Sequence, residues 1–231
     1  DIGNTRIKWR HQPANGDIKQ GSLEKSHAPL FSWPNDVDVD VVVVSSVRDD
    51  EELTRLFEQC YPNKVNWLTS PILDFDGFHH CYSDATRLGV DRWLAMLGAR
   101  KHQAGDLIVV DAGTALTVDV LSANNHHQGG YIVPGLNMAR DALFNGTGKV
   151  RPFADETDDD NITLGKNTRH CVNAGTLRQH HALVSSVCSE FPEYTLLVTG
   201  GDGQALAGLL NTGYYSDLIF DGMDSLCAGL F

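Results

Sequence analysis

The sequence lacks the features of membrane-spanning and disulfide-stabilised proteins. No apolar run approaches the roughly 18 residues that a spanning helix needs, and no signal-peptide pattern opens the chain. The cysteines number five, an odd count, and none forms a Cys-x-x-Cys pair. Neither a disulfide framework nor a zinc knuckle is indicated, so we expect a reduced, cytoplasmic environment.

Basic residues are also scarce. Lys and Arg total 18 against 30 Asp and Glu, which gives a net charge of −12. This balance argues against nucleic acid or an anionic membrane as a partner. A local phosphate site remains compatible with it, because backbone amides and a bound cation can supply the attraction that the net charge does not. We therefore expect a small-molecule ligand.

Several common catalytic motifs are absent as well. There is no Gly-x4-Gly-Lys-Ser/Thr loop, and residues 146–149 lack its spacing. Neither a Gly-x-Gly-x-x-Gly turn after a strand nor a Gly-x-Ser-x-Gly elbow occurs. Adjacent histidines stand at 79–80, 126–127 and 180–181. Neighbouring side chains point to different faces, so we interpret these histidines as surface residues rather than metal ligands.

A duplicated Asp-x-Gly turn is the feature that stands out. Asp111-Ala112-Gly113-Thr114-Ala115 follows an apolar run, and Asp1-Ile2-Gly3-Asn4-Thr5 has the same pattern 110 residues earlier. The glycine permits a tight turn, nearby amides and hydroxyls can bind phosphate oxygens, and the carboxylate can bind a cation. A third apolar run ends at Thr199-Gly200-Gly201-Asp202. Two such turns in one chain predict a two-lobed phosphate site.

The order of expected elements predicts an α/β protein of two lobes. At 231 residues the chain can bury a large core, and β and α segments alternate along it. We place an N-terminal lobe at 1–105 and a C-terminal lobe at 106–231, with the break at Gly105-Asp106. The expected elements are strands at 6–10, 37–44, 65–68, 107–120, 130–133 and 195–199, and helices at 49–59, 83–103, 137–144, 167–188 and 203–210. The acidic stretch 155–160 is interpreted as a solvated loop. No apolar strand leads into Asp1, so we expect further residues ahead of it.

The segment Leu88-Gly89-Val90-Asp91-Arg92-Trp93 is a candidate acceptor site. Its carboxylate can take a proton from a hydroxyl group, while the guanidinium of Arg92 and the phenol of Tyr82 can orient an anionic substrate. The alternative is structural, with Asp91 in the first turn of a helix and Arg92 as its counter-ion. Sequence chemistry alone leaves both interpretations open.

Taken together, these motifs resemble the type III pantothenate kinases, members of the acetate kinase, sugar kinase, Hsp70 and actin superfamily. The resemblance implies a ribonuclease H-like, actin-like ATPase fold with mixed sheets flanked by helices. It also implies ATP-dependent phosphorylation of pantothenate, the first step of coenzyme A synthesis. The matching segments follow the family's order along the chain: 1–8, 89–92, 111–115, 129–135 and 165–168.

The resemblance also implies a role for each matching residue. Asp91 matches the family's proton acceptor, and Asp111 matches its monovalent-cation aspartate, for K⁺ or NH₄⁺. Asp1 would lie near Mg²⁺, and Thr114 would contact ATP. The remaining cofactor-binding residues are those of the first loop: Ile2, Gly3, Asn4, Thr5, Arg6, Ile7 and Lys8. The residues matching the pantothenate site are Tyr82, Gly89, Val90, Asp91, Arg92 and Thr168. The threonine implies a homodimer with the acceptor site near its interface.

The main alternative is a nucleotide-binding regulatory accessory protein of the same fold, with little or no kinase turnover. The resemblance extends to proteins first described as accessory factors for gene expression. Another small-molecule kinase of the superfamily is a further alternative, for which the pocket around Tyr82 and Arg92 is the discriminator. The chain also departs from the family's pattern between Phe144 and Phe153. Because Asp91 has no use in a pure binding protein, we favour the kinase.

Overall fold

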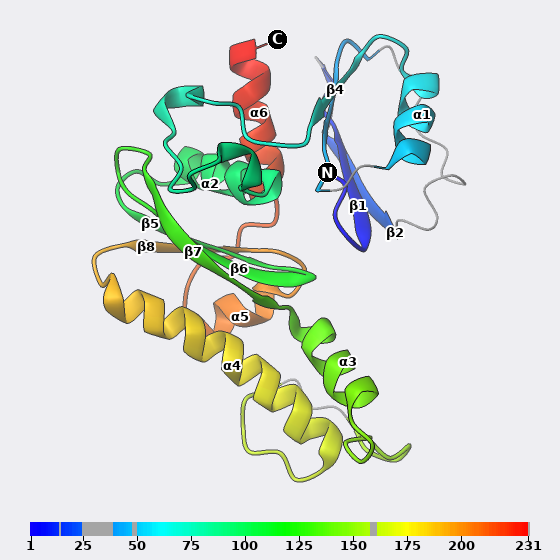
Figure 1. The fold of residues 1–231 in the computed structure, drawn as a ribbon, viewed down its shortest axis with the longest axis vertical. Helices are drawn as coiled ribbons and strands as arrows, with labels where there is room; N and C mark the ends of the chain where they lie inside the picture. The colour runs from blue at the N-terminus through cyan, green and yellow to red at the C-terminus, as the bar shows by residue number, and fades with distance from the viewer. Residues whose placement is uncertain (14, 25–38, 48–49, 158–160, 231) are drawn as a thin grey trace. The chain divides into compact units, whose positions relative to one another are not determined.

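The computed structural model describes residues 1–13, 15–24, 39–47, 50–157 and 161–230. These residues form two compact units (Figure 1). The first combines residues 1–76, 82–101 and the C-terminal 218–231, and the second combines 77–81 with 102–217. The longest segment of the second unit begins at residue 102, and the lobe boundary at 105 stays a prediction. The C-terminal segment, however, groups with the first unit, whereas the sequence pattern suggested a continuous second lobe.

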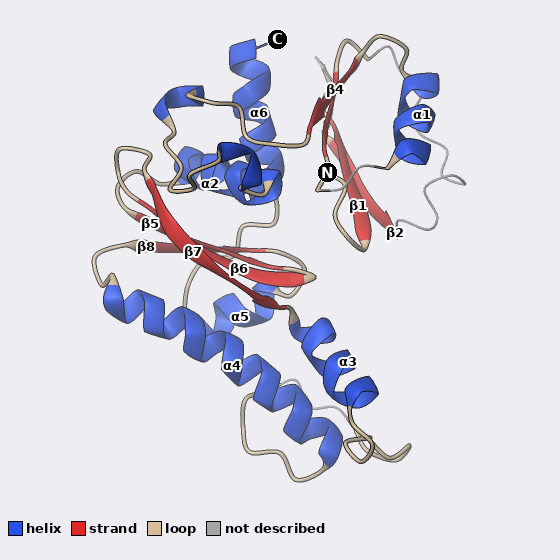
Figure 2. Ribbon diagram, in the orientation of Figure 1, coloured by secondary structure: helices blue, strands red, loops and turns tan. Residues whose placement is uncertain are grey.

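The first unit contains two short sheets and a helix (Figure 2). Strands β1 (Arg6–His11) and β2 (Lys19–Glu24) form an antiparallel hairpin, and β3 (Val42–Ser45) pairs in parallel with β4 (Val65–Leu68). Helix α1 (Glu51–Cys60) begins where the Asp50 side chain accepts a hydrogen bond from the Leu53 amide. Its apolar face packs in a core with both sheets. This core contains Ile2, Ile7, Val44, Leu53, Phe57 and Tyr61.

Two further helices complete the first unit. Helix α2 (Val90–His102) and helix α6 (Leu218–Leu230) approach so closely that glycines are required at their contact. A Cβ atom on Gly98 would lie 1.9 Å from the Leu218 carbonyl oxygen, and one on Gly222 would lie 2.1 Å from the Leu94 carbonyl oxygen. Any larger residue at either position would force the helices apart.

The second unit is built on a four-stranded sheet in the order β7-β6-β5-β8. The central hairpin joins β5 (Leu107–Ala112) to β6 (Ala115–Leu121), which pairs on its other side with the antiparallel β7 (His127–Pro134). Strand β8 (Thr195–Thr199) pairs with β5 in parallel. The sheet is therefore mixed, and β5 is a central strand that ends at the second Asp-x-Gly turn.

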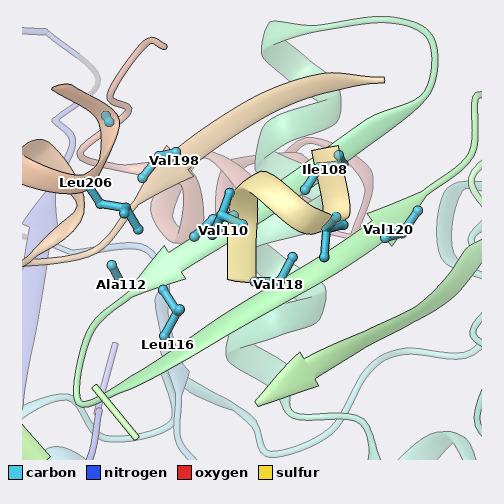
Figure 3. Close-up of a cluster of buried hydrophobic side chains, with 11 residues drawn as sticks. Ile108, Val110, Ala112, Leu116, Val118, Val120, Val198 and Leu206 are labelled. Carbon is cyan, nitrogen blue, oxygen red and sulfur yellow. The ribbon is translucent and has the colours of Figure 1, made fainter. Parts of the chain in front are cut away.

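Three helices accompany this sheet. Helices α4 (Thr168–Glu190) and α5 (Gly203–Leu210) cover one face, where buried side chains of the strands lie (Figure 3), and α3 (Leu136–Gly146) packs beside α4 (Figure 1). Alternate residues of β5 and β6 point into the core, as expected for strands with one face against helices. The core members are Ile108, Val110, Ala112, Leu116, Val118, Val120, Val184, Val187, Val198, Leu206 and Ala207.

Most expected elements are confirmed, with several differences. Strand β2 was not expected from the sequence, and the stretch expected as a strand at 107–120 is the β5–β6 hairpin. The helix expected at 83–103 begins only at Val90, because Ala85–Arg87 forms a separate 3-10 turn, capped by Asp84, ahead of it. Helix α6 was not identified from the sequence. Residues 37–38, 49 and 158–160 of three expected elements lie outside the described residues.

Candidate functional site

The two Asp-x-Gly turns have similar backbone structures, with one more residue in the first turn. In the first, the Lys8 amide donates to the Asp1 carbonyl at 2.9 Å and the Gly3 amide donates to the Arg6 carbonyl at 3.0 Å. In the second, Asp111 pairs with Thr117, and the Gly113 amide donates to the Ala115 carbonyl at 3.0 Å. Both are hairpins closed by their glycine, which supports the inferred duplication.

Both turns also lie beside the end of a parallel strand. The Ile2 amide donates to the Ser45 carbonyl at 2.8 Å, where β3 ends, and Asp111 of β5 lies opposite Thr199 of β8. The Ser45 hydroxyl also donates to Asp1 Oδ1 at 2.9 Å. Each turn is therefore held between a hairpin partner and the end of a parallel strand, where ligands bind in open α/β sheets.

Exposure separates two kinds of residue in the first loop. Ile2 and Ile7 are each 1% exposed and anchor the loop in the core. The segment 4–6, which contains Asn4, Thr5 and Arg6, is exposed to solvent, and Asp1, Gly3 and Lys8 are half-buried. The polar members are thus available to a ligand, while the two isoleucines contribute through packing.

Two glycines from other segments hold the second loop. Gly200 has φ +94°, and a Cβ there would lie 2.4 Å from both the Ala112 carbonyl oxygen and Asp111 Oδ1. A Cβ on Gly135 would lie 2.2 Å from the Gly113 carbonyl oxygen. The Gly135 amide donates to the Thr114 carbonyl at 3.0 Å. Hence the turn at 199–202 and the segment ending at 135 both pack against the loop that carries Asp111 and Thr114.

Tyr214 is a neighbour of this loop that the sequence did not reveal. Its hydroxyl donates to the Gly200 carbonyl at 3.0 Å. Burial raises the pKa of Tyr214, and the negative charges of Asp217 and Asp111 raise it further. The phenol therefore stays protonated and can keep donating that hydrogen bond. An isolated tyrosine after a glycine has no recognisable signal in the sequence.

The segment from Gly89 to Arg92 adopts a constrained conformation at the start of α2. Asp91 Oδ1 accepts a hydrogen bond from the Arg92 amide at 2.8 Å. A Cβ on Gly89 would lie 2.6 Å from that oxygen, so a side chain there would displace the carboxylate. Val90 is 1% exposed and anchors the turn. Asp91 is in the first helical turn, as the structural interpretation expected, and its carboxylate has a fixed orientation.

Arg92 and Tyr82 form the second part of this segment. Arg92 is 5% exposed, and its Nη1 donates to the Tyr82 hydroxyl at 2.9 Å. The guanidinium carbon lies 6.0 Å from the centre of the tyrosine ring. A buried guanidinium next to a phenol is a strong attraction for an anionic group. The structure thus brings Tyr82 and Arg92 together, and their role toward an anionic substrate stays a prediction.

Thr168 is the first residue of α4. The Asn167 side chain accepts from the His170 amide at 2.7 Å, and Glu156 accepts from the amides of Arg169 at 2.8 Å and Thr168 at 3.4 Å. The negative Glu156 carboxylate suits the positive end of the helix dipole. Glu156 belongs to the stretch interpreted as a solvated loop, so at least this member has a defined structural partner.

Two of the three histidine pairs, 126–127 and 180–181, each contain a buried histidine. His127 and His180 are each 3% exposed, so the interpretation of the pairs as surface residues is wrong for these two. His127 contacts Asp119, and His180 contacts the Pro134 carbonyl oxygen. Neighbouring side chains point to different faces of a helix or strand. One histidine of a pair is therefore buried when another element covers its face.

The carboxylates and hydroxyls at the two Asp-x-Gly turns are oxygen ligands of the kind that hard cations prefer. Across the residues that the structure describes, no three His, Cys, Asp or Glu side chains cluster as a metal site would require. The Asp1 carboxylate and the Ser45 hydroxyl lie together in one unit, and the Asp111 carboxylate belongs to the other. Magnesium is commonly held by one or two carboxylates together with substrate phosphates, so this donor set fits a nucleotide-bound cation.

Comparisons with known proteins give the family. The sequence model described as type III pantothenate kinase matches residues 1–190. The chain belongs to the type III pantothenate kinase family. The enzyme of that name from Marinobacter nauticus is 31% identical over 99% of this chain and 96% of its own length. The corresponding protein of Alcanivorax borkumensis is 33% identical over 99% and 97%.

Solved structures show the fold of this family member. A Campylobacter jejuni protein described as a Baf family transcriptional activator is 21% identical, with a TM-score of 0.61 over 98% of this chain and 96% of its own. A Sinorhizobium meliloti protein described as a 2-dehydro-3-deoxygalactonokinase is 10% identical, with a TM-score of 0.55 over 98% and 97%. The expected two-lobed, ribonuclease H-like fold of the actin-like ATPases is confirmed. No described helix is long and apolar enough to cross a membrane.

Proposed function

We propose that this pantothenate kinase transfers the γ-phosphoryl group of ATP to the primary hydroxyl of pantothenate, with Asp91 as the proton acceptor. Membership of the family supports the reaction, which opens coenzyme A synthesis. The observation that carries the assignment of Asp91 is the fixed carboxylate at the start of α2, beside the buried Arg92. A general base needs such a fixed position within reach of the hydroxyl.

The acceptor residues have separate tasks in this proposal. The second carboxylate oxygen of Asp91 takes the hydroxyl proton, while Oδ1 stays bound to the Arg92 amide. Arg92 and Tyr82 orient the pantothenate carboxylate, because a guanidinium and a phenol can both donate to it. Gly89 keeps the carboxylate in place by leaving room for it, and Val90 anchors the turn.

The two loops bind the nucleotide. Asn4, Thr5, Arg6 and Lys8 of the first loop and Thr114 of the second provide polar groups for the phosphates, and all of them are exposed or half-buried. Asp1 binds Mg²⁺ and Asp111 binds K⁺ or NH₄⁺. Bound cations neutralise the charge that develops on the transferred phosphoryl group. Ile2, Gly3 and Ile7 give the first loop its shape.

The lobes and the assembly belong to the same proposal. We assign the first phosphate loop and the acceptor segment to residues 1–105, and the second loop and adenosine-side loops to 106–231. The protein acts in the cytoplasm as a homodimer in which Thr168 completes the acceptor site near the interface. Exposed apolar side chains on β7 and α3 support an interface in the second unit. These are Tyr131, Ile132, Met138 and Leu143.

The regulatory accessory protein is the less favoured function. Such a protein has to bind nucleotide, and it has no use for a carboxylate held beside a buried guanidinium. The geometry of Asp91, Arg92 and Tyr82 therefore favours turnover. The guanidinium of Arg92 and the phenol of Tyr82 favour an acceptor with an anionic group over a neutral sugar.

Substitution of Asp91 tests the mechanism. We expect Asp91→Asn to lower pantothenate-dependent ADP release by about 10²-fold or more, because the amide cannot accept the proton. ATP should still raise the melting temperature of the variant, because the nucleotide loops are unchanged. Asp17→Asn, at an exposed position of the β1–β2 hairpin, is the control and should keep full turnover. Unchanged turnover in Asp91→Asn would remove Asp91 from the base role.

A further inference from the structure

A cysteine, a histidine and an aspartate meet in the second unit outside the residues assigned above. Cys81 ends a short segment that runs beside the turn before β7. The His79 amide donates to the Asn125 carbonyl at 3.0 Å, and the His127 amide donates to the His79 carbonyl at 2.8 Å. These backbone bonds hold Cys81 next to the His127 side chain.

The three side chains form a chain of contacts. Cys81 Sγ lies 3.6 Å from His127 Nδ1, and His127 Nε2 lies 2.8 Å from Asp119 Oδ1. The histidine and aspartate side chains are 0% and 3% exposed, whereas Cys81 is exposed. An ionised Asp119 only accepts hydrogen bonds, so it selects the tautomer with hydrogen on Nε2. The Nδ1 lone pair then faces the thiol.

This arrangement has the parts of an activated nucleophile. A nucleophile lies within reach of a base, and a third group orients that base. The Asp119 and His127 side chains are buried, whereas the Cys81 thiol that contacts His127 is exposed to solvent. A proton that moves from Cys81 to His127 leaves a thiolate next to an imidazolium, and the buried Asp119 stabilises that imidazolium.

We propose that Cys81 is a site of S-thiolation by low-molecular-weight disulfides. The Cys81 sulfur attacks one sulfur of the reagent, so a new S–S bond forms and the reagent's S–S bond breaks. The Cys81 proton passes to His127 Nδ1 and from there to the departing thiolate. Cys81 is oxidised to a mixed disulfide, half of the reagent is reduced to a free thiol, and no other oxidant is needed.

The other cysteines provide a contrast within the same chain. Burial raises the pKa of the Cys188 thiol, and burial together with Asp224 raises the pKa of the Cys227 thiol. Both thiols are therefore protonated at neutral pH and react slowly. Cys60 is half-buried, and Cys171 is exposed on the first turns of α4. Cys171 is thus the internal reference for an accessible thiol.

The test uses oxidised glutathione and the full chain. The thiolate is the reactive form, and an ordinary thiol is only a few per cent ionised at neutral pH, so we expect Cys81, with His127 as its base, to react about tenfold faster than Cys171. Peptide mapping by mass spectrometry gives the rate at each cysteine, and Cys81→Ser should lose the fast adduct. In urea the two rates should become equal, because the His127 contact is lost. Equal rates in the folded protein would overturn the proposal.

Substitution of His127 tests the role of the base. His127→Gln keeps a donor for Asp119 but has no basic nitrogen, so we expect the Cys81 rate to fall to that of Cys171. Circular dichroism checks that the variant is folded. If it is not, the original protein still tests the proposal, through its Cys81 and Cys171 rates with and without urea. A folded His127→Gln protein that reacts at Cys81 as fast as the original would overturn the assignment of His127.

One consequence rests on the proposed function. Cys81 directly precedes Tyr82 in the chain, so a glutathionyl group there should hinder the contact that we propose between Tyr82 and pantothenate and raise the KM for pantothenate. Reduction with dithiothreitol should restore the original KM, and Cys81→Ser should be insensitive to the disulfide. A modified protein with an unaltered KM would count against this link to Tyr82, whereas labelling rates report on the thiol independently of kinase activity.

Discussion

At the scale of single residues, the buried His180 makes the stability of the folded protein depend on pH. Its Nε2 lies 2.9 Å from the Pro134 carbonyl oxygen, next to the Gly135 that packs on the second loop. Burial lowers the pKa of His180 from its usual 6.5, and the positive Arg140 lowers it too, while the Pro134 hydrogen bond and Asp202 act in the opposite direction. The folded protein therefore holds this imidazole neutral.

The stability of the fold should respond to this histidine. Because the pKa is lower in the folded state, the unfolded chain binds the proton first as the pH falls. The free energy of unfolding should keep its full value above pH 6.5 and decrease below it, by at most about 1.4 kcal/mol per pH unit for one proton. Urea unfolding of the original and of His180→Gln, between about pH 5.5 and 7.5, measures this slope.

A control variant and the sign of the pH dependence separate the contribution of His180 from those of other groups. His126→Gln changes an exposed histidine and should leave the slope unchanged. Burial raises the pKa of Asp202, which makes stability fall as the pH rises through that value, so its effect has the opposite sign. An unaltered slope in His180→Gln would show that another group is responsible.

At the scale of elements, the segment after β7 is held by a contact that only glycine allows. We expect Gly135→Ala to destabilise the protein by about 1–3 kcal/mol, as overpacking does, because its Cβ would lie 2.2 Å from the Gly113 carbonyl oxygen. It should also raise the KM for ATP by displacing Thr114. Urea unfolding and pantothenate-dependent ADP release provide the two measurements.

A second glycine provides the matched control. Gly175 is an exposed residue of α4, and a Cβ there would meet nothing within 4 Å. Gly175→Ala should be neutral or stabilising by up to about 1 kcal/mol, since alanine is the better helix former. If both alanine variants behaved alike, the close approach of Gly135 to the loop would not matter.

The attachment of α6 to β1 is also an element-scale feature. Arg10 Nη2 donates to the Phe220 carbonyl at 2.8 Å and to Asp224 Oδ1 at 2.5 Å, and the guanidinium carbon lies 5.0 Å from the centre of the Phe220 ring. The Arg10 side chain is 10% exposed. These contacts join residues about 210 positions apart in the sequence. The helix is thereby fixed within the first unit.

Removal of this arginine should destabilise the protein. We expect Arg10→Ala to cost about 2 kcal/mol in urea unfolding, because a buried hydrogen-bonded charge is lost and its acceptors remain. Arg55→Ala removes an exposed pair with Glu51, of which the side chains are 74% and 88% exposed, and should change stability by less than about 0.5 kcal/mol. A comparable loss in the two variants would contradict the structural role of Arg10.

At the scale of the whole molecule, turnover should depend on cations bound in both units. We expect replacement of potassium by sodium to lower pantothenate-dependent ADP release, because Asp111 is proposed to bind the monovalent cation beside the second loop. Asp111→Asn should have low activity and a much smaller response to potassium. The ratio of rates in the two salts is the measurement. A ratio that Asp111→Asn leaves unchanged would place the cation elsewhere.

Local patterns in the sequence determined much of the architecture. Strand β8 at 195–199 and helix α5 at 203–210 have the expected bounds, since a short apolar run that ends at a glycine pair leaves few alternatives. The paired Asp-x-Gly turns were recognisable for the same reason, and their matching hydrogen bonds agree with that interpretation. Tyr82 and Arg92 were both named from the sequence as candidates for binding an anionic substrate, and the structure places them in contact.

Tertiary structure alone decided which distant groups meet. The position of α6 beside α2 depends on Gly98 and Gly222, which are 124 positions apart in the sequence and have no local signature for that contact. The burial of His127 and His180, and the contact of Tyr214 with Gly200, likewise depend on which face another element covers. Periodicity reports the face on which a side chain lies, whereas the partner of that face is set by long-range packing.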